Sequence, residues 1–448
     1  MRSGSGLGTS PGGKPRGVVG LTVLFAGGLV AAACSGGGGS TPGAPLASSV
    51  GAVDTSAPVR HDVDGVLRLG VWLPTTGPAA ALGTPLKAAV RLAVAAINAA
   101  GGVNGHPVEL TARDEGGSDS TASGALDDLL QTDQVDGIIG PASSRIALGA
   151  LDVIAQAKAV TCSPVATAID LDQRRDQGYF ERTIGSDALE ANALGRAMFN
   201  TGDSNFAVLY PDDDYGREYG DRVKSYFSRL RVDVRLVPYD PTATEFNGPA
   251  QSAIAGGTQV IGVIGSEPSG PAVLAALAAN GAPPREVPTF VTDGLRRADL
   301  GSLIDPARPN ASAGIHGVSP QSEPADQTFA QLFARAQPGT PLSYVAYAFD
   351  CVNLIALSAD AAGSDDPEKI QARLVDVSSG GSPCTGFEAC AKQLALGRNI
   401  DFNGASGDLD LLDNGDVGVA NYELFTFDAK GDDMPTDQFT MPANPGGA

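Results

Sequence analysis

The sequence predicts an α/β fold made of two doubly wound lobes, each with a mostly parallel sheet covered by helices. From residue 66 onward, short apolar runs typical of buried strands alternate with longer segments of helical periodicity. The alternation restarts after residue 187, which indicates a second lobe of the same kind. The 448-residue chain is 42% hydrophobic and 18% charged, so it can bury substantial cores and is not a disordered polyelectrolyte. Strands that alternate with helices are joined by right-handed crossovers, which places them parallel.

The first lobe is predicted from four strands and three helices in strict alternation. A strand is expected to begin at Leu67, and further strands are expected at 108–112, 137–139 and 159–163. Helices are expected at 84–100, 122–131 and 144–157. The first helix ends at Gly101 and Gly102, which is a common way for a helix to stop.

The second lobe repeats this order, and a different organisation follows residue 314. Helices are expected at 188–199, 219–230, around 250–255 and at 271–279, with strands at 206–210, 232–237, 260–264 and 288–291. Further helices are expected at 327–335, 344–361 and 368–377, and residues 402–427 alternate in the manner of strands. The Pro-rich segment 433–448 is predicted to be a loose tail.

The chain is strongly acidic, with a net charge of −21. Residues 1–33 contain three basic and no acidic residues, so the chain without them has 27 basic and 51 acidic residues and a net charge of −24. Nucleic-acid binding requires clustered Lys and Arg, so this charge argues against a nucleic-acid partner.

The N-terminus has the features of a signal peptide. Residues 1–17 contain Arg2, Lys14 and Arg16, and residues 18–33 are apolar or small throughout. This apolar stretch is shorter than the roughly 20 residues of a spanning helix, but it suits the hydrophobic region of a signal peptide. We therefore expect residues 1–33 to be a signal peptide and the protein to be exported.

Cys34 follows this leader at the position of a lipid anchor. The run Ala31-Ala32-Ala33-Cys34 resembles the bacterial lipobox, although Leu is usual where this chain has Ala31. Residues 35–57 are rich in Gly, Ser, Pro, Ala and Thr, as in a flexible tether. We expect lipidation of Cys34, residues 34–65 as the tether, and attachment to the outer face of the cell membrane. The alternative is cleavage by ordinary signal peptidase, with an incidental Cys.

The four remaining cysteines favour disulfides, because their number is even and the chain is expected to be exported. Cys384 and Cys390 close a short loop and are predicted to pair locally. Cys162 and Cys351 lie in a strand-like and a helical run, and they either pair or stay free and buried. The three histidines show no ligand spacing to one another or to the cysteines, so no metal and no cofactor is predicted.

The predicted ligand site lies at the carboxyl ends of the strands, where open α/β sheets bind ligands. The loops at these ends are 73–78, 140–144 and 163–167 in the first lobe and 211–216, 265–268 and 292–294 in the second. First-lobe loops offer hydroxyls and helix-start N–H groups, as at Ser143 and Ser144, which favour an anion. Second-lobe loops offer acids, of which Asp293 directly follows a buried strand and favours a cation. A zwitterionic amino acid would require both kinds of group, one for its carboxylate and one for its ammonium group.

Each of these residues also has a structural explanation. Ser144 alone is explained by helix N-capping, and Asp213 and Asp214 by solvated loop positions. Tyr215 is either a surface aromatic of a turn or a wall of the cleft. Trp72, at the end of the first strand, is either cleft wall or core.

These loops, in this order, resemble those of the branched-chain amino-acid-binding proteins of ABC transporters. These belong to the type I periplasmic-binding-protein superfamily, near the leucine/isoleucine/valine-binding protein. The resemblance covers about residues 66–428 and is carried by the segments LPTTGP (73–78), INAAGGVNG (97–105), IGPASS (139–144), SPVAT (163–167), DYG (214–216) and YAFD (347–350).

The resemblance implies two Rossmann-like lobes joined by three crossover strands, near residues 183–186, 314–317 and 400–404. Lobe 1 would then consist of residues 66–185 and 316–403, and lobe 2 of residues 186–315 and 404–432. Closure of the lobes about the crossovers would trap the ligand.

The resemblance also implies roles for individual residues. The hydroxyls of Ser144 and Thr167 would meet the carboxylate and amino group of the ligand, with a backbone carbonyl from Val165. Tyr215 would be an aromatic of the second lobe, and Asp293 the acidic partner of the ammonium group. A second aromatic of the family is replaced by Ser266, which changes the pocket wall. Ser143 and Trp72 complete the set of candidate ligand-binding residues.

The function implied is that of an extracytoplasmic solute-binding lipoprotein of an ABC importer. It would capture a small amino acid or related polar solute between closing lobes and deliver it to the permease subunits, acting as a monomer tethered to the membrane. The alternative is a sensing module for an amide, urea-like or aromatic acid solute that acts through a receptor. A structural adhesin would not need hydroxyls and acids divided across a cleft.

An enzyme is not expected. The Gly-x-Ser-x-Gly match at 8–12 lies in the leader, and the sequence has neither a phosphate-binding loop nor a His-Glu-x-x-His motif.

Overall fold

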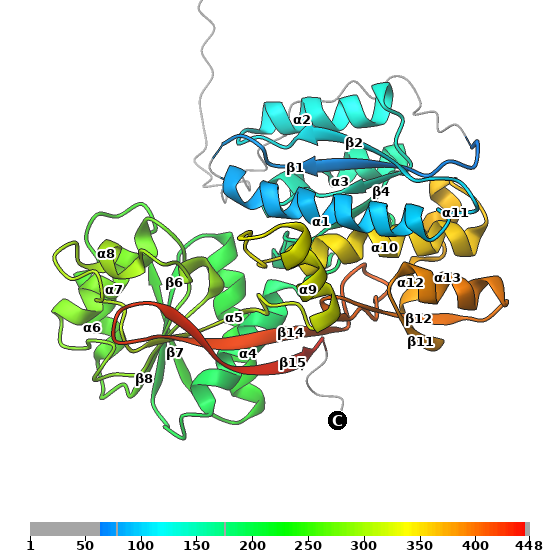
Figure 1. The fold of residues 1–448 in the computed structure, drawn as a ribbon. Helices are drawn as coiled ribbons and strands as arrows, with labels where there is room; N and C mark the ends of the chain where they lie inside the picture. Colours follow the sequence, from blue (N-terminus) through cyan, green and yellow to red (C-terminus); the bar gives the residue numbers. More distant parts are fainter. Residues whose placement is uncertain (1–62, 78, 174–175, 444–448) are drawn as a thin grey trace, which may run out of the picture. The chain divides into compact units, whose positions relative to one another are not determined.

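The computed structural model describes residues 63–443 except 78, 174 and 175 (Figure 1). The expected signal peptide, Cys34 and nearly all of the expected tether therefore lie outside the described residues, as do residues 444–448.

The first sheet has five strands in the order β2-β1-β3-β4-β5, and all neighbouring strands are parallel. Figure 1 shows α2 on one side of this sheet and α1 with α10 on the other. Successive side chains of a strand point to opposite faces of the sheet, so both faces carry a layer of helices. Gly70 of β1 faces Leu129 in one layer, and Gly137 of β3 faces Ile355 of α10 in the other. The elements of this layer are β1 (Arg68–Leu73), α1 (Ala80–Ala99), β2 (Glu109–Asp114), α2 (Asp119–Asp127), the π-helical turn η1 (Asp128–Thr132), β3 (Gly137–Ile139), α3 (Ser144–Ala157), β4 (Val160–Ser163), the 3-10 turn η2 (Ile169–Asp172), β5 (Phe180–Arg182) and α10 (Val345–Ala362).

The second sheet has seven strands in the order β15-β14-β10-β9-β8-β6-β7. The strands from β7 to β10 are parallel, and β14 and β15 are added antiparallel at one edge. One face of this sheet packs against α6, α7 and α8 and forms one apolar cluster with them. The other face packs against α4 and α5 in an apolar cluster that continues into the first lobe. The elements are α4 (Asp187–Phe199), β6 (Phe206–Pro211), α5 (Asp214–Arg229), β7 (Val234–Tyr239), α6 (Asn247–Ile254), β8 (Val260–Val263), α7 (Ser269–Ala279), β9 (Thr289–Val291), the 3-10 turn η3 (Asp293–Leu295), α8 (Leu300–Ile304), β10 (Ile315–Pro320), β14 (Val419–Phe427) and β15 (Asp433–Pro442).

A small third sheet, β11-β12-β13, was not predicted as a separate unit. It lies with short helices in the segment between β10 and β14. The elements are α9 (Gln327–Ala336), α11 (Pro367–Gln371), α12 (Leu374–Ser378), β11 (Ser382–Thr385), α13 (Phe387–Ala395), β12 (Ile400–Gly404) and β13 (Gly407–Asp408).

The α/β fold with two parallel-sheet lobes is confirmed, but the predicted lobe change at 315/316 is wrong. Strand β10 pairs with β9 and β14 along Ile315–Pro320 and therefore still belongs to the second sheet. The chain leaves that sheet only after Pro320. The sequence could not show this, because a strand at a crossover has the same apolar pattern as a strand inside a sheet.

The predicted loose tail is also wrong for residues 433–442, which form β15 and pair with β14. Most residues of β15 are exposed, so the strand lacks the alternating apolar pattern that identifies strands. It is an edge strand, where proline is tolerated, and Pro435 lies next to the register shift at Leu424/Phe425.

Two helices begin earlier than predicted because glycines permit close backbone contacts. Helix α1 begins at Ala80 rather than residue 84, and a Cβ on its Gly83 would lie 1.6 Å from the carbonyl oxygen of Pro74. Helix α5 begins at Asp214 rather than residue 219, and a Cβ on Gly216 would lie 2.0 Å from the carbonyl oxygen of Pro211. Both contacts bring a helix N-terminus close to the loop at the end of a strand.

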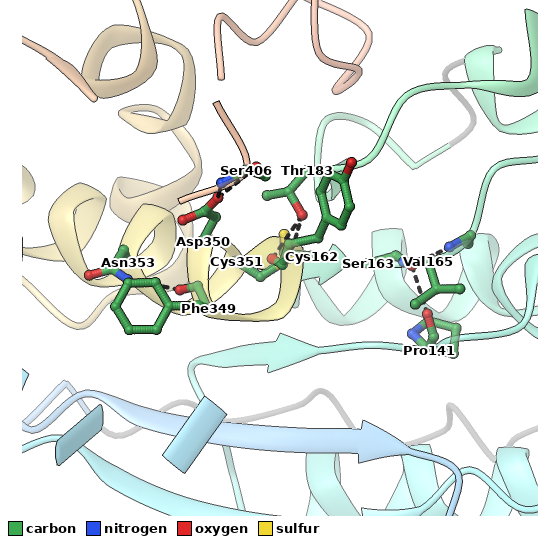
Figure 2. The surroundings of a disulfide bond; sticks show 12 residues. Pro141, Cys162, Ser163, Val165, Thr183, Phe349, Asp350, Cys351, Asn353 and Ser406 are labelled. Carbon is green, nitrogen blue, oxygen red and sulfur yellow. Dashed lines mark hydrogen bonds between the residues drawn. A yellow bond between two sulfur atoms is a disulfide. The ribbon is translucent and has the colours of Figure 1, made fainter. Parts of the chain in front are cut away.

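The structure contains both disulfides, Cys384–Cys390 and Cys162–Cys351. The local pair is confirmed, and of the two alternatives for Cys162 and Cys351 the structure has the bonded one. This second bridge joins β4 to α10 in the core of the first lobe (Figure 2). Thr183 lies beside it, with its hydroxyl 3.0 Å from the Tyr347 carbonyl oxygen and 3.4 Å from Cys351 Sγ.

Two helices, α1 and α10, are long and apolar enough to meet the criteria for a membrane span. Half of the tested window of α1 and 78% of that of α10 are buried inside the fold. A core helix meets the same criteria, and the burial of these two helices is that of core helices.

We predict that the long-range disulfide stabilises the protein more than the local one does. A bridge that closes a loop of 189 residues restricts the unfolded chain far more than one that closes a loop of 6. Replacing Cys162 and Cys351 together by Ala should lower the free energy of unfolding by about 2–5 kcal/mol, and replacing Cys384 and Cys390 by about 2 kcal/mol or less. Urea denaturation of the two double variants measures this difference, and an equal or reversed order would contradict it.

Candidate functional site

Two loops at the carboxyl ends of β3 and β4 are joined by Ser163. Its hydroxyl donates to the carbonyl oxygen of Pro141 at 2.7 Å and accepts the N–H group of Val165 at 3.3 Å, as Figure 2 shows. It also accepts the N–H group of Ala166 at 2.9 Å. The loop after β4 is therefore held to the loop after β3, which is where parallel sheets bind ligands.

Ser144 and Thr167, both predicted site residues, lie together in the structure. Ser144 Oγ accepts the N–H groups of Thr167 at 3.0 Å and Ala168 at 3.3 Å. Because the hydroxyl acts as acceptor in both bonds, its own proton remains to be donated. Both residues and Val165 are partly exposed. This loop pair can offer a hydroxyl donor to an anionic group.

The N–H groups at the start of α3 bind a carboxylate of the protein itself. The N–H groups of Ala142 and Ser143 donate to Glu115 at 2.8 and 2.9 Å, while Ser143 Oγ caps the helix by accepting from Ile146. Burial raises the pKa of Glu115 to about 7, although the two N–H groups act in the opposite direction. The expectation that these N–H groups receive a ligand anion is therefore not met at Ala142 and Ser143.

Trp72 belongs to the core, which is one of the two alternatives for this residue. Its side chain is fully buried. It borders a small apolar cavity between α2 and α3, with Leu126 and Ile146 among the other lining residues. The indole therefore packs under the helices of the first sheet and does not form a wall of the ligand site.

The first turn of α4 connects the two lobes at the site. Ser186 caps the helix by accepting the N–H group of Ala188 at 3.2 Å. The next residue, Asp187, donates its backbone N–H to the carbonyl oxygen of Thr167 at 2.8 Å. This bond places a carboxyl group of the second lobe beside the hydroxyl loop of the first.

Three carboxyl groups gather here: Asp187 and Glu190 of α4, and Asp293 at the start of η3. The backbone N–H of Asp293 donates to Glu190 Oε1 at 3.0 Å. Asp187 is 5% exposed and Glu190 is 1% exposed. We call Asp187, Glu190 and Asp293 the carboxyl cluster.

Burial raises the pKa of every member of the carboxyl cluster, and repulsion within the cluster adds to the shift at Asp187 and Glu190. Burial, followed by the charge of Asp293, raises the pKa of Asp187 to about 7, against hydrogen bonding from Thr167 and the charge of Arg182. Burial, then Asp293 and Asp187, raise the pKa of Glu190 well above its usual range. Burial raises the pKa of Asp293 to about 6, opposed by the Gly294 N–H group and by Arg296. The cluster therefore favours a cation nearby.

Aromatic side chains from both lobes surround the carboxyl cluster. Tyr215 is 39% exposed in the first turn of α5, with its ring 5.9 Å from that of Tyr219. Tyr344 precedes α10 in a left-handed conformation, with φ of 62°. Burial of the phenol oxygen, followed by the carboxyl-cluster charges, raises the pKa of Tyr344 and also that of Tyr215, whose side chain as a whole is partly exposed, well above the usual range.

The arginines near the cluster already have carboxylate partners. Arg182 Nη2 lies 2.7 Å from Asp172, and Arg182 Nε donates to Asp416 at 2.7 Å. Arg296 pairs with Glu423 and, at 2.8 Å, with Asp433. Among the described side chains, no salt bridge involves a member of the carboxyl cluster.

A hollow of about 330 Å³ adjoins Asp293. It is also lined by Arg296 of the second lobe, by Ser319 and Ser322 around the end of β10, and by Tyr344 of the first lobe. Its lining is mixed and mostly polar, and Asp293 is the member of the predicted site that borders it. The volume is at the lower end of that of small-ligand pockets.

Ser266 is exposed and lies close to Asp293. A Cβ added to Gly294 would lie 3.3 Å from the Ser266 Cβ and 2.8 Å from the Gly265 carbonyl oxygen. The loops after β8 and β9 therefore touch each other, and Ser266 leaves space where a larger side chain would fill the wall.

Hydrogen bonds thus link Ser144 to the Thr167 loop and that loop to Asp187, and one turn further along α4 Glu190 is hydrogen-bonded to Asp293. Sequence reasoning missed Asp187, Glu190, Glu115 and Tyr344. Asp187 directly follows the predicted crossover at 183–186, and Glu115 follows β2, so the strand-end rule could have included both. Glu190 has no such signal, because it lies inside a helix whose other positions are mostly apolar.

The described residues contain no group of three or more His, Cys, Asp or Glu side chains arranged to hold a metal ion.

The sequence profile of the periplasmic binding protein family matches residues 66–431 of this chain. The chain belongs to this family, as a type I periplasmic binding protein of the branched-chain amino-acid group. Its members are solute-binding proteins, not enzymes, and they work outside the cytoplasm. The resemblance noted in the loop motifs is thereby confirmed.

Individual relatives agree with this assignment. The chain is 26% identical over 307 residues to Leu/Ile/Val-binding protein homolog 1 of Brucella suis, and the aligned region covers 67% of this chain and 80% of that protein. It is 27% identical over 357 residues to BasB, the substrate-binding protein of a chemotactic signal transduction system of Halobacterium salinarum. This alignment covers 77% of this chain and 83% of BasB.

Solved structures share the fold. The leucine binding protein LivK of Thermotoga maritima superposes with a TM-score of 0.64 at 20% identity, covering 85% of this chain and 99% of that one. A solute binding protein of R. palustris, solved with benzoate, superposes with a TM-score of 0.61 at 17% identity, covering 85% and 98%.

The carboxyl cluster predicts how stability depends on pH. A carboxyl whose pKa is raised on folding stabilises the fold fully below its unfolded pKa of about 4, and this contribution is lost as the pH rises through the folded pKa. For Asp293 and Asp187 the loss begins above about pH 4 and is complete once the pH has passed their folded pKa values of about 6 and about 7. The melting temperature of the unliganded protein should therefore fall by several degrees between pH 5 and pH 8.

The double variant Asp187→Asn, Glu190→Gln should show a smaller fall in melting temperature, and the exposed-site variant Asp212→Asn the same fall as the wild type. Some decrease will remain, because the pKa of Glu115 is also raised. A scan by differential scanning fluorimetry would contradict the prediction if the double variant lost as many degrees as the wild type.

Proposed function

We propose that this protein is the solute-binding lipoprotein of an ABC importer and that it captures an amino acid between its two lobes. The observation that carries the proposal is the linked row of groups across the lobes: the Ser144 hydroxyl, the Thr167 loop, and the carboxyls of Asp187 and Asp293. A donor hydroxyl suits the ligand carboxylate, and the acids suit its ammonium group. The solute would then pass to permease subunits of the membrane.

The electrostatic term is large enough to select the ligand. Two unit charges 4 Å apart interact by about 4 kcal/mol at the effective dielectric constant typical near a protein surface. An ammonium group beside Asp293 gains this attraction, whereas an acid without an amino group faces repulsion of the same order. The carboxyl cluster therefore favours an amino acid over a simple aromatic acid such as the benzoate bound by the R. palustris protein.

A sensing role is the second candidate, and the relation to BasB supports it. That relative is a substrate-binding protein of a chemotactic signal transduction system. The same closed, ligand-bound form could be read by a receptor instead of a permease. The two roles share the ligand site and differ in the partner.

Residues 1–57 support attachment to the membrane through a lipid on Cys34. The proposal rests on the basic and apolar leader, the small residues before Cys34 and the Gly- and Ser-rich segment after it. A lipid would hold the acidic binding domain near the permease.

We predict that Asp293→Ala weakens amino-acid binding at least tenfold, which is about 1.4 kcal/mol, because an ammonium group loses a buried carboxylate. Asp212→Ala is the control: Asp212 is exposed and pairs with Arg217 at 2.7 Å, outside the cluster. Isothermal titration calorimetry with the best amino acid from a thermal-shift screen measures both variants. Equal effects of the two substitutions would remove Asp293 from the site.

We predict that Cys34→Ala releases the full-length protein into the soluble fraction, since a single thioether-linked residue carries the anchor. Fractionation of cells that express either form, followed by detergent extraction, measures the distribution. If the variant still required detergent, the anchor would lie elsewhere in the chain.

A further inference from the structure

The carboxyl cluster contains more carboxyl groups than one ammonium group can pair with. Glu190 accepts the Asp293 N–H group at 3.0 Å, the charge of Asp293 raises the pKa of Asp187 and of Glu190, and the charge of Asp187 also raises that of Glu190. A zwitterionic amino acid brings one positive charge to these three groups. Its single charge would pair with one carboxylate and leave the other two carboxyl groups without a cation.

Glu190 is the member whose charge has no evident structural use. The residue is 1% exposed, and its Oε2 atom is buried without a hydrogen-bond partner among the described residues. Its other oxygen faces Asp293, so the carboxyl is directed toward the ligand-facing acid. A buried carboxylate without a partner is unfavourable, and a ligand that supplies a partner charge would remove this cost.

The protein does not supply this charge from the cations described near the site. Arg182 contacts Asp172 and Asp416, and Arg296 contacts Glu423 and Asp433. The described residues also show no arrangement suited to a metal ion. What remains is a proton or an organic cation.

The hollow beside Asp293 offers a place for a longer cationic side chain. Its volume is about 330 Å³, and its lining includes Ser319, Ser322 and Tyr344. Arg296 and Arg297 also line it, and each of these two guanidinium groups already pairs with two carboxylates. Hydroxyls accept hydrogen bonds from ammonium and guanidinium groups, and an aromatic face attracts cations.

We propose that the captured solute carries a net positive charge, as a basic amino acid does, and that Glu190 sets this preference through its charge behind Asp293. The inference rests on the proposed function, because it assumes that an amino acid occupies the site. It goes further by naming the class of side chain and the residue that selects it.

Matched pairs of ligands test this directly. L-ornithine has a terminal amino group that L-norvaline lacks. L-arginine ends in a charged guanidinium group, whereas L-citrulline ends in a neutral group of similar shape. We expect calorimetry at pH 7.5 to show the charged member of each pair bound at least tenfold more tightly by the wild type. L-leucine serves as the reference for an uncharged side chain.

The variant Glu190→Gln keeps an acceptor for the Asp293 N–H group and removes only the charge. It should reduce the preference for ornithine over norvaline, and for arginine over citrulline, at least tenfold, and it should weaken the binding of leucine, which brings only one ammonium group, less than that of ornithine or arginine. Asp212→Asn, an exposed acid of the same lobe, is the matched control and should leave both ratios unchanged. A melting curve of each variant confirms that it is folded.

A pH series provides a second readout that a purely structural role of Glu190 would not affect. The titratable and charged groups that face Glu190 and its cluster are Asp187 on its own helix, Asp293 on η3, Tyr215 and Tyr219 on α5, Tyr344 before α10, Tyr422 on β14, Asp172 on η2, Arg182 on β5 and Arg296 after η3. The tyrosines stay protonated and the arginines charged, so only the carboxyls change between pH 5.5 and 8. The preference of the wild type for charged ligands should grow across this range and should grow less in Glu190→Gln.

The outcomes separate the two proposals. If norvaline and citrulline bind as tightly as their charged partners, or if Glu190→Gln leaves the ratios unchanged, the inference about charge is wrong and the proposed function stands. If none of the five amino acids binds to the folded wild-type protein, the amino-acid function itself fails, and the inference fails with it.

Discussion

One buried cation, Arg182, holds the parts of the binding site in register. Its side chain is 1% exposed and contacts Asp172 from the loop beyond β4 and Asp416 from the segment that leads into β14. It also donates to the carbonyl oxygen of Ala168 at 3.0 Å, next to the loop that positions Thr167. Removing one partner of a buried ion pair costs about 3–5 kcal/mol. The position of the loop 163–167 therefore depends on this guanidinium. The hydrogen bonds between that loop and the Ser144 hydroxyl depend on it in turn.

The charged residues that the structure describes around the site fall into two groups, those paired with one another and those without a partner charge. Arg182 and Arg296 each neutralise two carboxylates that tie strands and loops together. Asp187, Glu190 and Asp293 lie next to these pairs and remain without a cation among the described side chains. Sites of this kind trade stability of the free protein for affinity, since a bound cation relieves the repulsion. The fold thus provides rigid walls through its ion pairs and leaves its unpaired charges for the ligand.

Much of the architecture follows from periodicity, but several site features do not. The pattern of 144–157 defines α3 to the residue, and Asp293 could be proposed as a site residue because it lies just after the buried strand β9. Strand β15 escaped notice because its contacts are backbone bonds at an exposed edge. Glu115 and Glu190 depend on tertiary proximity: the first reaches α3 from β2, and the second reaches η3 from α4. No local spacing encodes such contacts between distant segments.

The central claim is that the amino group of a solute binds at the carboxyl cluster while its carboxylate meets the hydroxyl loop. A crystal structure of the domain with the amino acid that stabilises it most tests this directly. We predict the amino nitrogen about 3 Å from a carboxylate oxygen of Asp187 or Asp293 and the ligand carboxylate at a similar distance from Ser144 Oγ. A solute bound elsewhere, or one whose carboxylate faces Asp293, would contradict the account.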